Sequence, residues 1–73
     1  MDFGQALNAL KNGTDVKVTR VGWNGANMHV ALQLPDGHSK MELPYLYMFT
    51  AQGKHVPWVA SQSDLLAEDW MLV

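Results

Sequence analysis

Between Met28 and Leu34, large apolar side chains alternate with smaller or polar ones at every second position. No other feature constrains the fold of this chain as strongly. The two sets of positions are Met28, Val30, Leu32 and Leu34, and His29, Ala31 and Gln33. This is the period of a β-strand, whose successive side chains point to opposite faces of a sheet. The next residues, Pro35-Asp36-Gly37, predict a turn, because proline presets one dihedral and glycine accepts a positive φ. We therefore expect a strand over residues 28–34 that ends in a reversal of the chain.

Further short strands are expected on both sides of this one. They cover residues 16–20, 45–50 (with an earlier start at 41–43 and a break or bulge at Pro44), 55–59 and 70–73. Turn residues at 22–25 and 52–53 separate them. The segment 45–50 is apolar on both faces, which suggests a partner surface. Its two faces carry Tyr45, Tyr47 and Phe49, and Leu46, Met48 and Thr50.

Two helical segments complete the prediction. Asp2 and Gln5 have the spacing of a capping box, and apolar residues then recur at helical intervals. Gly13 stands where a left-handed cap would close the segment, so residues 3–11 are expected to form a short amphipathic helix. Near the other end of the chain, a serine at 61 or 63 caps a helical turn over residues 64–68.

The expected fold class is α+β: a short N-terminal helix plus a four- to five-stranded antiparallel sheet with a helical turn before the last strand. The connections are short, which favours hairpin or meander pairing. A chain of 73 residues forms a single small domain, 1–73, with a thin core. It has no cysteine, and its three histidines lack the spacing of a zinc site, so we expect no metal. Self-association remains as a source of further burial, which favours a homo-oligomer.

The charge pattern limits the partners. The net charge is −2 and no basic stripe exists, which argues against binding a nucleic acid polymer. A small nucleotide is not excluded, because a pocket can hold it by stacking and backbone donors. No apolar run is long enough to span a bilayer, and the N-terminus lacks the pattern of a signal peptide. We expect a cytoplasmic protein that does not contact a membrane.

The three tryptophans have different interpretations. Trp23 lies between turn glycines, where its ring can face a flat ligand or fold back over the core. Trp58 follows Pro57, whose place in a strand indicates an edge or an end, so it is either a packing lid or a stacking platform. Trp70 is interpreted as a core anchor, because tryptophan is highly buried on average.

The stretch Ser61-Gln62-Ser63-Asp64 offers hydroxyls, an amide and a carboxylate at a helix start. These groups can simply cap the turn, or they can accept hydrogen bonds from ribose hydroxyls or an adenine amine. Catalysis has little support, because no nucleophile elbow and no glycine-rich phosphate loop is present. Binding is favoured over turnover.

Two parts of the chain carry a resemblance. They are Phe3-Gly4-Gln5-Ala6-Leu7 with Gly13 and residues 20–25, and residues 44–48 with Gly53 and residues 56–70. The last of these, Pro-Trp…Ser-Gln…Asp…Ala-Glu-Asp-Trp, is the most specific. Together they resemble the second class of Thoeris anti-defence proteins, a small phage and prophage family, over nearly the whole chain.

The resemblance implies a non-enzymatic sponge without a cofactor. Relatives bind a cyclic ADP-ribose isomer made by a bacterial immune sensor and hold it intact, so that the effector is not activated. Some also bind cyclic dinucleotides at separate sites. They are tetramers, built as dimers of dimers, with ligand pockets between subunits, and they act in the host cytoplasm.

By the same resemblance, the candidate ligand-binding residues are Trp23, Asn24, Tyr47, Trp58, Ser61, Gln62 and Asp64. We expect Trp23 or Trp58 to stack on the base, with Gln62 and Asp64 at its polar edges. The connection from Leu34 to Pro44 looks shorter than in typical members, so ligand identity or affinity can differ. The alternative function is a protein-interaction module that binds a host or virion protein through an apolar strand face.

Overall fold

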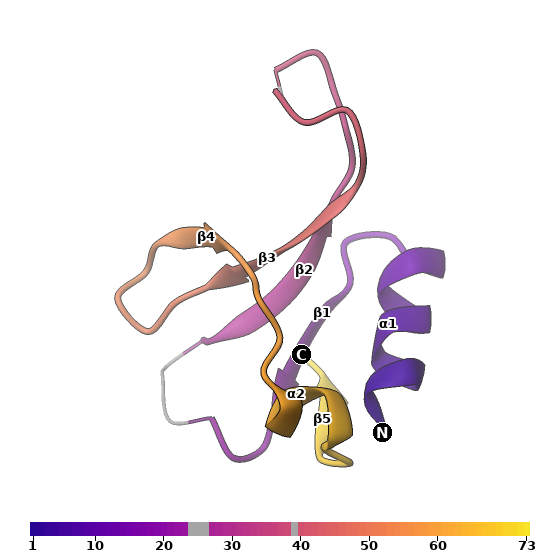
Figure 1. Ribbon diagram of the computed structural model, residues 1–73, viewed down its shortest axis with the longest axis vertical. Helices are drawn as coiled ribbons and strands as arrows, with labels where there is room; N and C mark the ends of the chain where they lie inside the picture. The colour runs from indigo at the N-terminus through magenta and orange to yellow at the C-terminus, as the bar shows by residue number, and fades with distance from the viewer. Residues whose placement is uncertain (24–26, 39) are drawn as a thin grey trace.

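The computed structural model describes residues 1–23, 27–38 and 40–73 and shows an α+β fold, as predicted (Figure 1). Its elements are α1 (Phe3–Asn12), β1 (Lys17–Arg20), β2 (His29–Gln33), β3 (Tyr45–Phe49), β4 (His55–Pro57), α2 (Gln62–Leu66) and β5 (Trp70–Leu72). The strands form one antiparallel sheet in the order β4-β3-β2-β1-β5. The first four make the predicted meander. The last strand returns past α2 to pair with β1 at the opposite edge of the sheet.

The predicted capping box starts helix α1. The Asp2 carboxylate accepts a hydrogen bond from the Gln5 backbone amide at 2.8 Å, and the Gln5 side chain accepts one from the Asp2 amide at 3.0 Å. Two donors that a helix start leaves free are thereby satisfied. The apolar face of the helix that follows this cap places Ala6 and Leu10 against the sheet, where both are buried. Packing on the sheet supplies the stability that so short a helix lacks alone.

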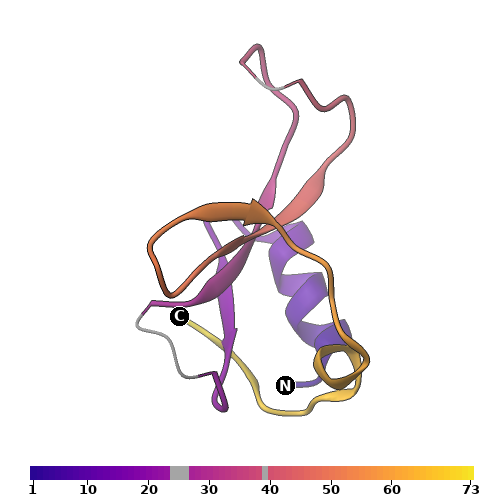
Figure 2. The ribbon, with the colours of Figure 1, turned by 60° about the vertical axis from the view of Figure 1, so that its left-hand side comes forward.

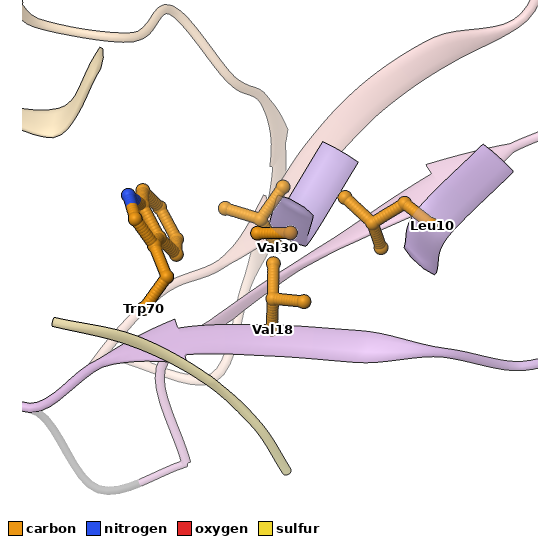
Figure 3. Packing of buried hydrophobic residues seen from close by; sticks show 5 residues of the cluster. Leu10, Val18, Val30 and Trp70 are labelled. Atoms are coloured by element: carbon orange, nitrogen blue, oxygen red, sulfur yellow. The ribbon is translucent and has the colours of Figure 1, made fainter. Parts of the chain in front are cut away.

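The core lies between α1 and one face of the sheet. Its buried residues are Ala6, Leu10, Val18, Val30 and Trp70, and Figure 3 labels the last four of them. Val18 and Val30 are paired across β1 and β2, so both project to the same side. The residues that alternate with them face the other side of the sheet, and neither described helix makes contacts there. Helix α2 packs on α1 beside the core.

Several predicted details are wrong. Gly13 is extended (φ −99°, ψ 173°), because its amide already closes the helix on the Ala9 carbonyl at 2.9 Å and the chain then runs straight toward β1. The left-handed residue in that loop is Asp15 (φ 55°). Gly37 has no positive φ, whereas Gly53 does (φ 79°) and makes the predicted turn there.

Some element bounds also differ. Strand β3 begins at Tyr45, and no strand forms over 41–43, because Pro44 has no amide to donate to a sheet ladder. Strand β4 ends at Pro57. Helix α2 starts two residues earlier than predicted, because Ser61 rather than Ser63 is the capping residue.

The space around Gly13 gives a test of the α1–β1 connection. A Cβ atom there would overlap Val16 Cγ2 and lie 2.9 Å from the Ala9 carbonyl oxygen. We expect Gly13→Ala to lower the free energy of unfolding by about 1–3 kcal/mol, the usual cost of overpacking. Gly37→Ala is the control, because nothing lies within 4 Å of the added atom. Urea unfolding of both variants measures the difference, and equal stabilities would contradict this packing.

Candidate functional site

The start of α1, helix α2 and strand β5 meet at one end of the molecule (Figures 1 and 2). Four aromatic rings from this part of the fold contact one another. We call Phe3, Trp23, Trp58 and Trp70 the aromatic cluster. Trp70 is its centre, with ring centroids 5.4 Å from Phe3, 5.3 Å from Trp23 and 5.9 Å from Trp58. Both tryptophan contacts are edge-to-face, the favoured geometry of aromatic pairs. The cluster therefore holds its outer rings in defined orientations.

Trp70 anchors the cluster. Its side chain is 2% exposed, and its indole Nε1 donates a hydrogen bond to the Asp64 carbonyl oxygen at 2.9 Å. The predicted role of Trp70 as a core anchor is confirmed. Trp23 and Trp58 are only half-buried, so each combines packing on Trp70 with a partly accessible ring.

Arg20, the last residue of β1, binds one carboxylate in α2 and one just before β5. Its Nε donates to Asp69 Oδ1 at 2.8 Å, and its Nη1 donates to Asp64 Oδ1 at 2.9 Å. Asp69 Oδ2 also accepts the Gly22 backbone amide at 3.2 Å. One cation is thus bound by two carboxylates, and the group as a whole is anionic. Arg20 and Asp69 were not among the predicted site residues.

The positions of these charges follow from the sheet register. Arg20 pairs directly with Trp70 across β1 and β5, which brings Asp69, just before β5, and Asp64 in α2 within reach. A signal for this existed in the sequence, because Arg20 shares the apolar register of Val18. A charge on a core-facing position needs a charged partner.

The hydrogen bonds lower the pKa of both carboxyl groups. For Asp69 the bond from Arg20 is the largest cause and outweighs desolvation. For Asp64 partial burial acts to raise the pKa, but the bonds from Arg20 and Ser61 together outweigh it. These carboxyl groups therefore bind protons more readily in the unfolded chain than in the folded one. The network stabilises the fold above about pH 4, and this stabilisation is lost as the pH falls further.

We expect the protein to lose stability as the pH falls below about 4, and Asp69→Asn to make that loss shallower, because one carboxylate with a lowered pKa is removed. Glu42→Gln, an exposed change on the β2–β3 connection, is the control and should keep the wild-type slope. Urea unfolding at a series of pH values measures both. The same slope in all three proteins would show that the network does not control acid stability.

The network also positions Trp23. The Val21 amide donates to the Asp69 carbonyl at 3.2 Å, and the Trp23 amide closes a turn on the Arg20 carbonyl at 3.1 Å. Together with the Gly22 bond, these contacts attach the chain before Trp23 to Asp69, just before the start of β5. These bonds and the edge-to-face contact with Trp70 fix where the Trp23 ring lies relative to the core.

The start of α2 has the capping geometry that the sequence left as one of two interpretations. The Ser61 hydroxyl accepts the Asp64 amide at 3.1 Å, and Asp64 Oδ2 accepts the Ser61 amide at 3.3 Å. Both Asp64 carboxylate oxygens therefore have partners within the chain. Gln62, the first residue of the helix, is exposed.

The predicted site residues divide into two groups. Trp23, Trp58, Ser61, Gln62 and Asp64 lie around the aromatic cluster and α2. Tyr47 lies on the opposite face of the sheet, because it alternates with Leu46 and Met48, which pack on the core. Asn24 falls outside the described residues.

The hollows on the described surface lie beside Tyr45 and Tyr47 rather than beside the aromatic cluster. Four of them are lined by Tyr45, Tyr47 or both, and no tryptophan lines any of these four. Across residues 1–23, 27–38 and 40–73, no three histidine or acidic side chains lie together as a metal site requires. No helix in the same part of the chain is long and apolar enough to cross a membrane.

These features define a small α+β module with an ordered aromatic surface at one end, and comparison with known proteins identifies its family. The family model described as Tad2-like, Thoeris anti-defense 2-like domain, matches residues 1–73. Thoeris anti-defense 2 of Bacillus phage SP01 is 40% identical over 86 aligned positions, which cover 100% of this chain and 94% of the relative. The chain belongs to the Thoeris anti-defense 2-like family, as the resemblance predicted. Membership supports a phage anti-defence role.

The alignment also bears on the predicted short connection. The aligned region spans 86 positions against 73 residues in this chain, so the relative carries additional residues inside it. The predicted shorter connection agrees with this difference, because this chain lacks residues that the relative has. The alignment length does not place the difference at Leu34–Pro44, which stays a prediction.

Proposed function

We propose that this protein is a non-enzymatic sponge that binds a cyclic nucleotide immune signal in the host cytoplasm and keeps it from its effector. The observation that carries the proposal is the family match over residues 1–73, together with a phage relative that is 40% identical over the whole chain. The proposed ligand is a cyclic ADP-ribose isomer, with cyclic dinucleotides as further candidates.

The aromatic cluster supports base stacking as the mode of binding. The Trp23 ring packs edge-to-face on Trp70 and is otherwise partly accessible. A base stacked on an aromatic ring contributes about 1–3 kcal/mol, whatever the base. Gln62 offers an exposed amide next to the cluster, able to donate and accept at a base or ribose edge. The full set of proposed binding residues is Trp23, Asn24, Tyr47, Trp58, Ser61, Gln62 and Asp64.

Arg20 is a poor partner for the ligand's diphosphate. Its two hydrogen-bonded carboxylates more than neutralise its charge, and a phosphate beside them would be repelled. Other donors must hold the phosphates, either backbone amides or groups of a neighbouring copy. This fits the proposed assembly, a homotetramer of two dimers with pockets between subunits.

Assembly also explains why the proposed residues lie on two surfaces. Tyr47 and Trp23 are on opposite faces of the sheet, so one chain cannot bring both to one ligand. A second copy can place its Tyr47 side against the cluster of the first. The separation thus supports a pocket with walls from two chains.

Isothermal titration tests the proposal. The protein should bind at least one cyclic ADP-ribose isomer with a Kd in the micromolar range or below, about −8 kcal/mol or better. Linear ADP-ribose is the matched control, because it has the same chemical groups without the ring closure. The absence of heat with all cyclic ADP-ribose isomers and cyclic dinucleotides would reject the proposal.

A further inference from the structure

A hollow of about 350 Å³ lies beside a row of paired residues on the side of the sheet away from α1. In this row Lys17 of β1 and Tyr47 of β3 are both paired with Ala31 of β2, which lies between them. Adjacent strands are about 5 Å apart, so the two long side chains start about 10 Å apart. Ala31 puts only a methyl group between them, so this register leaves space that a larger residue would fill.

Basic and aromatic side chains line this hollow, which we call the Lys17 hollow. Its polar and aromatic lining consists of Lys17, Asn27, His29, Tyr47, Phe49 and His55. No acidic side chain of a described residue lines it, although the chain has seven acidic residues against five lysines and arginines. A basic hollow on a protein of negative net charge attracts an anion locally, where the rest of the surface repels it.

Lys17 brings a positive charge that the described chain does not neutralise. Its ammonium group makes no ion pair with a described residue, whereas Arg20 binds two carboxylates. The backbone of Lys17 is held on both sides, because it pairs with Ala31 and its carbonyl accepts the Val73 amide at 3.0 Å. A fixed strand position thus presents a cation whose partner must come from outside these residues.

His29 offers one ring nitrogen beside this cation. Its Nδ1 lies 2.7 Å from the Asn27 carbonyl oxygen, which only accepts, so Nδ1 carries a hydrogen. Stacking on Phe49, with centroids 5.2 Å apart and planes 12° from parallel, fixes the ring. Its Nε2 has no described partner, and no buried side-chain nitrogen or oxygen in the described residues lacks one, so Nε2 is accessible. It donates to an anion when the ring carries both hydrogens, as a cation.

His55 adds a second imidazole from β4. Its ring centroid lies 5.1 Å from that of Phe49 and 5.4 Å from that of Tyr47, with both pairs of planes steeply inclined. The basic side chains of the hollow therefore come from three different strands, β1, β2 and β4. They surround the space rather than follow one strand, as the binding of a compact group with several acceptor oxygens requires.

A diphosphate is the anion that the proposed ligand brings. It is negatively charged and its outer oxygens accept hydrogen bonds, which matches an ammonium group and imidazolium donors. The aromatic cluster supplies no such partner, because Arg20 is already bound by Asp64 and Asp69. Tyr47, one of the proposed binding residues, lines the Lys17 hollow, so the hollow belongs to the surface that a neighbouring copy is proposed to turn toward the cluster.

We propose that the Lys17 hollow binds the diphosphate of the nucleotide, with Lys17 supplying the charge and His29 and His55 the further hydrogen-bond donors. A ligand whose base stacks on Trp23 of one copy then has its diphosphate bound by Lys17 of another. The inference rests on the proposed function for the identity of the ligand. The affinity of the hollow for a diphosphate is independent of it.

An NMR titration with inorganic pyrophosphate, without divalent cations, tests the hollow by itself. Pyrophosphate should bind with a Kd in the millimolar range or below and shift the ring signals of His29 and His55. Lys17→Gln should weaken this binding by at least about 10-fold, because a charge-assisted hydrogen bond is lost. Lys17 is exposed, so its replacement keeps the fold.

Lys54→Gln is the matched control. It removes the same charge from another exposed lysine, which lines none of the four hollows on the described surface. Its affinity for pyrophosphate should be that of the wild type. The inference would be overturned by the absence of binding at about 10 mM pyrophosphate. Histidine signals that do not move, or equal weakening by both lysine variants, would overturn it as well.

Titration with a cyclic ADP-ribose isomer separates this inference from the proposed function. Lys17→Gln should weaken nucleotide binding by at least about 10-fold, and Lys54→Gln should leave it unchanged. Wild-type nucleotide affinity in a folded Lys17→Gln protein would overturn the inference and leave the proposed function intact. If pyrophosphate binds in the hollow and no cyclic nucleotide binds at all, the proposed function fails and the hollow stands as a phosphate site.

Discussion

Trp70→Ala should abolish the cooperative fold at 37 °C. The side chain is 2% exposed, touches Phe3, Trp23 and Trp58, and its indole hydrogen bond to Asp64 would be lost. Removing a buried tryptophan costs about 3–5 kcal/mol, a large part of the stability of a domain this small. Each kcal/mol lowers Tm by about 4–8 °C at this length, so a drop of at least about 12 °C is expected.

Leu72→Ala on the same strand is the control, because Leu72 is 55% exposed and should change Tm only slightly. Thermal unfolding followed by near-ultraviolet circular dichroism measures both variants. A Trp70→Ala protein with a wild-type Tm would show that the aromatic cluster is not the centre of the core.

Trp23→Ala should weaken binding of the cyclic nucleotide by roughly 5- to 150-fold while the protein stays folded. This range corresponds to the loss of one stacked base, about 1–3 kcal/mol. Trp23 also packs on Trp70, so titrations must be made well below the variant's Tm and with its fold confirmed.

Two further variants separate stacking from packing at this position. Val21→Ala, in the same turn and 70% exposed, should leave the affinity unchanged. Trp23→Phe should lose less affinity than the alanine variant, because it keeps a ring at the site. Wild-type affinity in a folded Trp23→Ala protein would remove Trp23 from the binding site.

Local patterns in the sequence predicted the local structure well. The Asp2–Gln5 capping box, the alternation before Leu34 and a serine cap before α2 all depend on residues three or fewer apart or on a simple period, and all are present. The sequence left Ser61 and Ser63 both open as the capping residue, and the structure has Ser61. Gly13 was misjudged because a glycine can be required by a left-handed φ or by lack of space, and spacing alone does not distinguish these.

Long-range contacts could not be predicted in the same way. The return of β5 to β1 brings Arg20 to Asp64 and Asp69, partners 44 and 49 residues away in the chain. Strands this short can pair in several registers, and the one that forms is selected by packing across the whole sheet rather than by the residues of one strand. The same topology separates Tyr47 from the other predicted site residues, a separation that the linear motif does not reveal.

Recovery of the bound signal is the most direct test of sequestration. The protein is incubated for several hours with a cyclic ADP-ribose isomer, separated from free ligand, and denatured by heat, and the released molecule is analysed by mass spectrometry. The account predicts that a near-stoichiometric amount returns with its mass and retention time unchanged. Recovery of a cleaved product, or of no nucleotide at all, would contradict it.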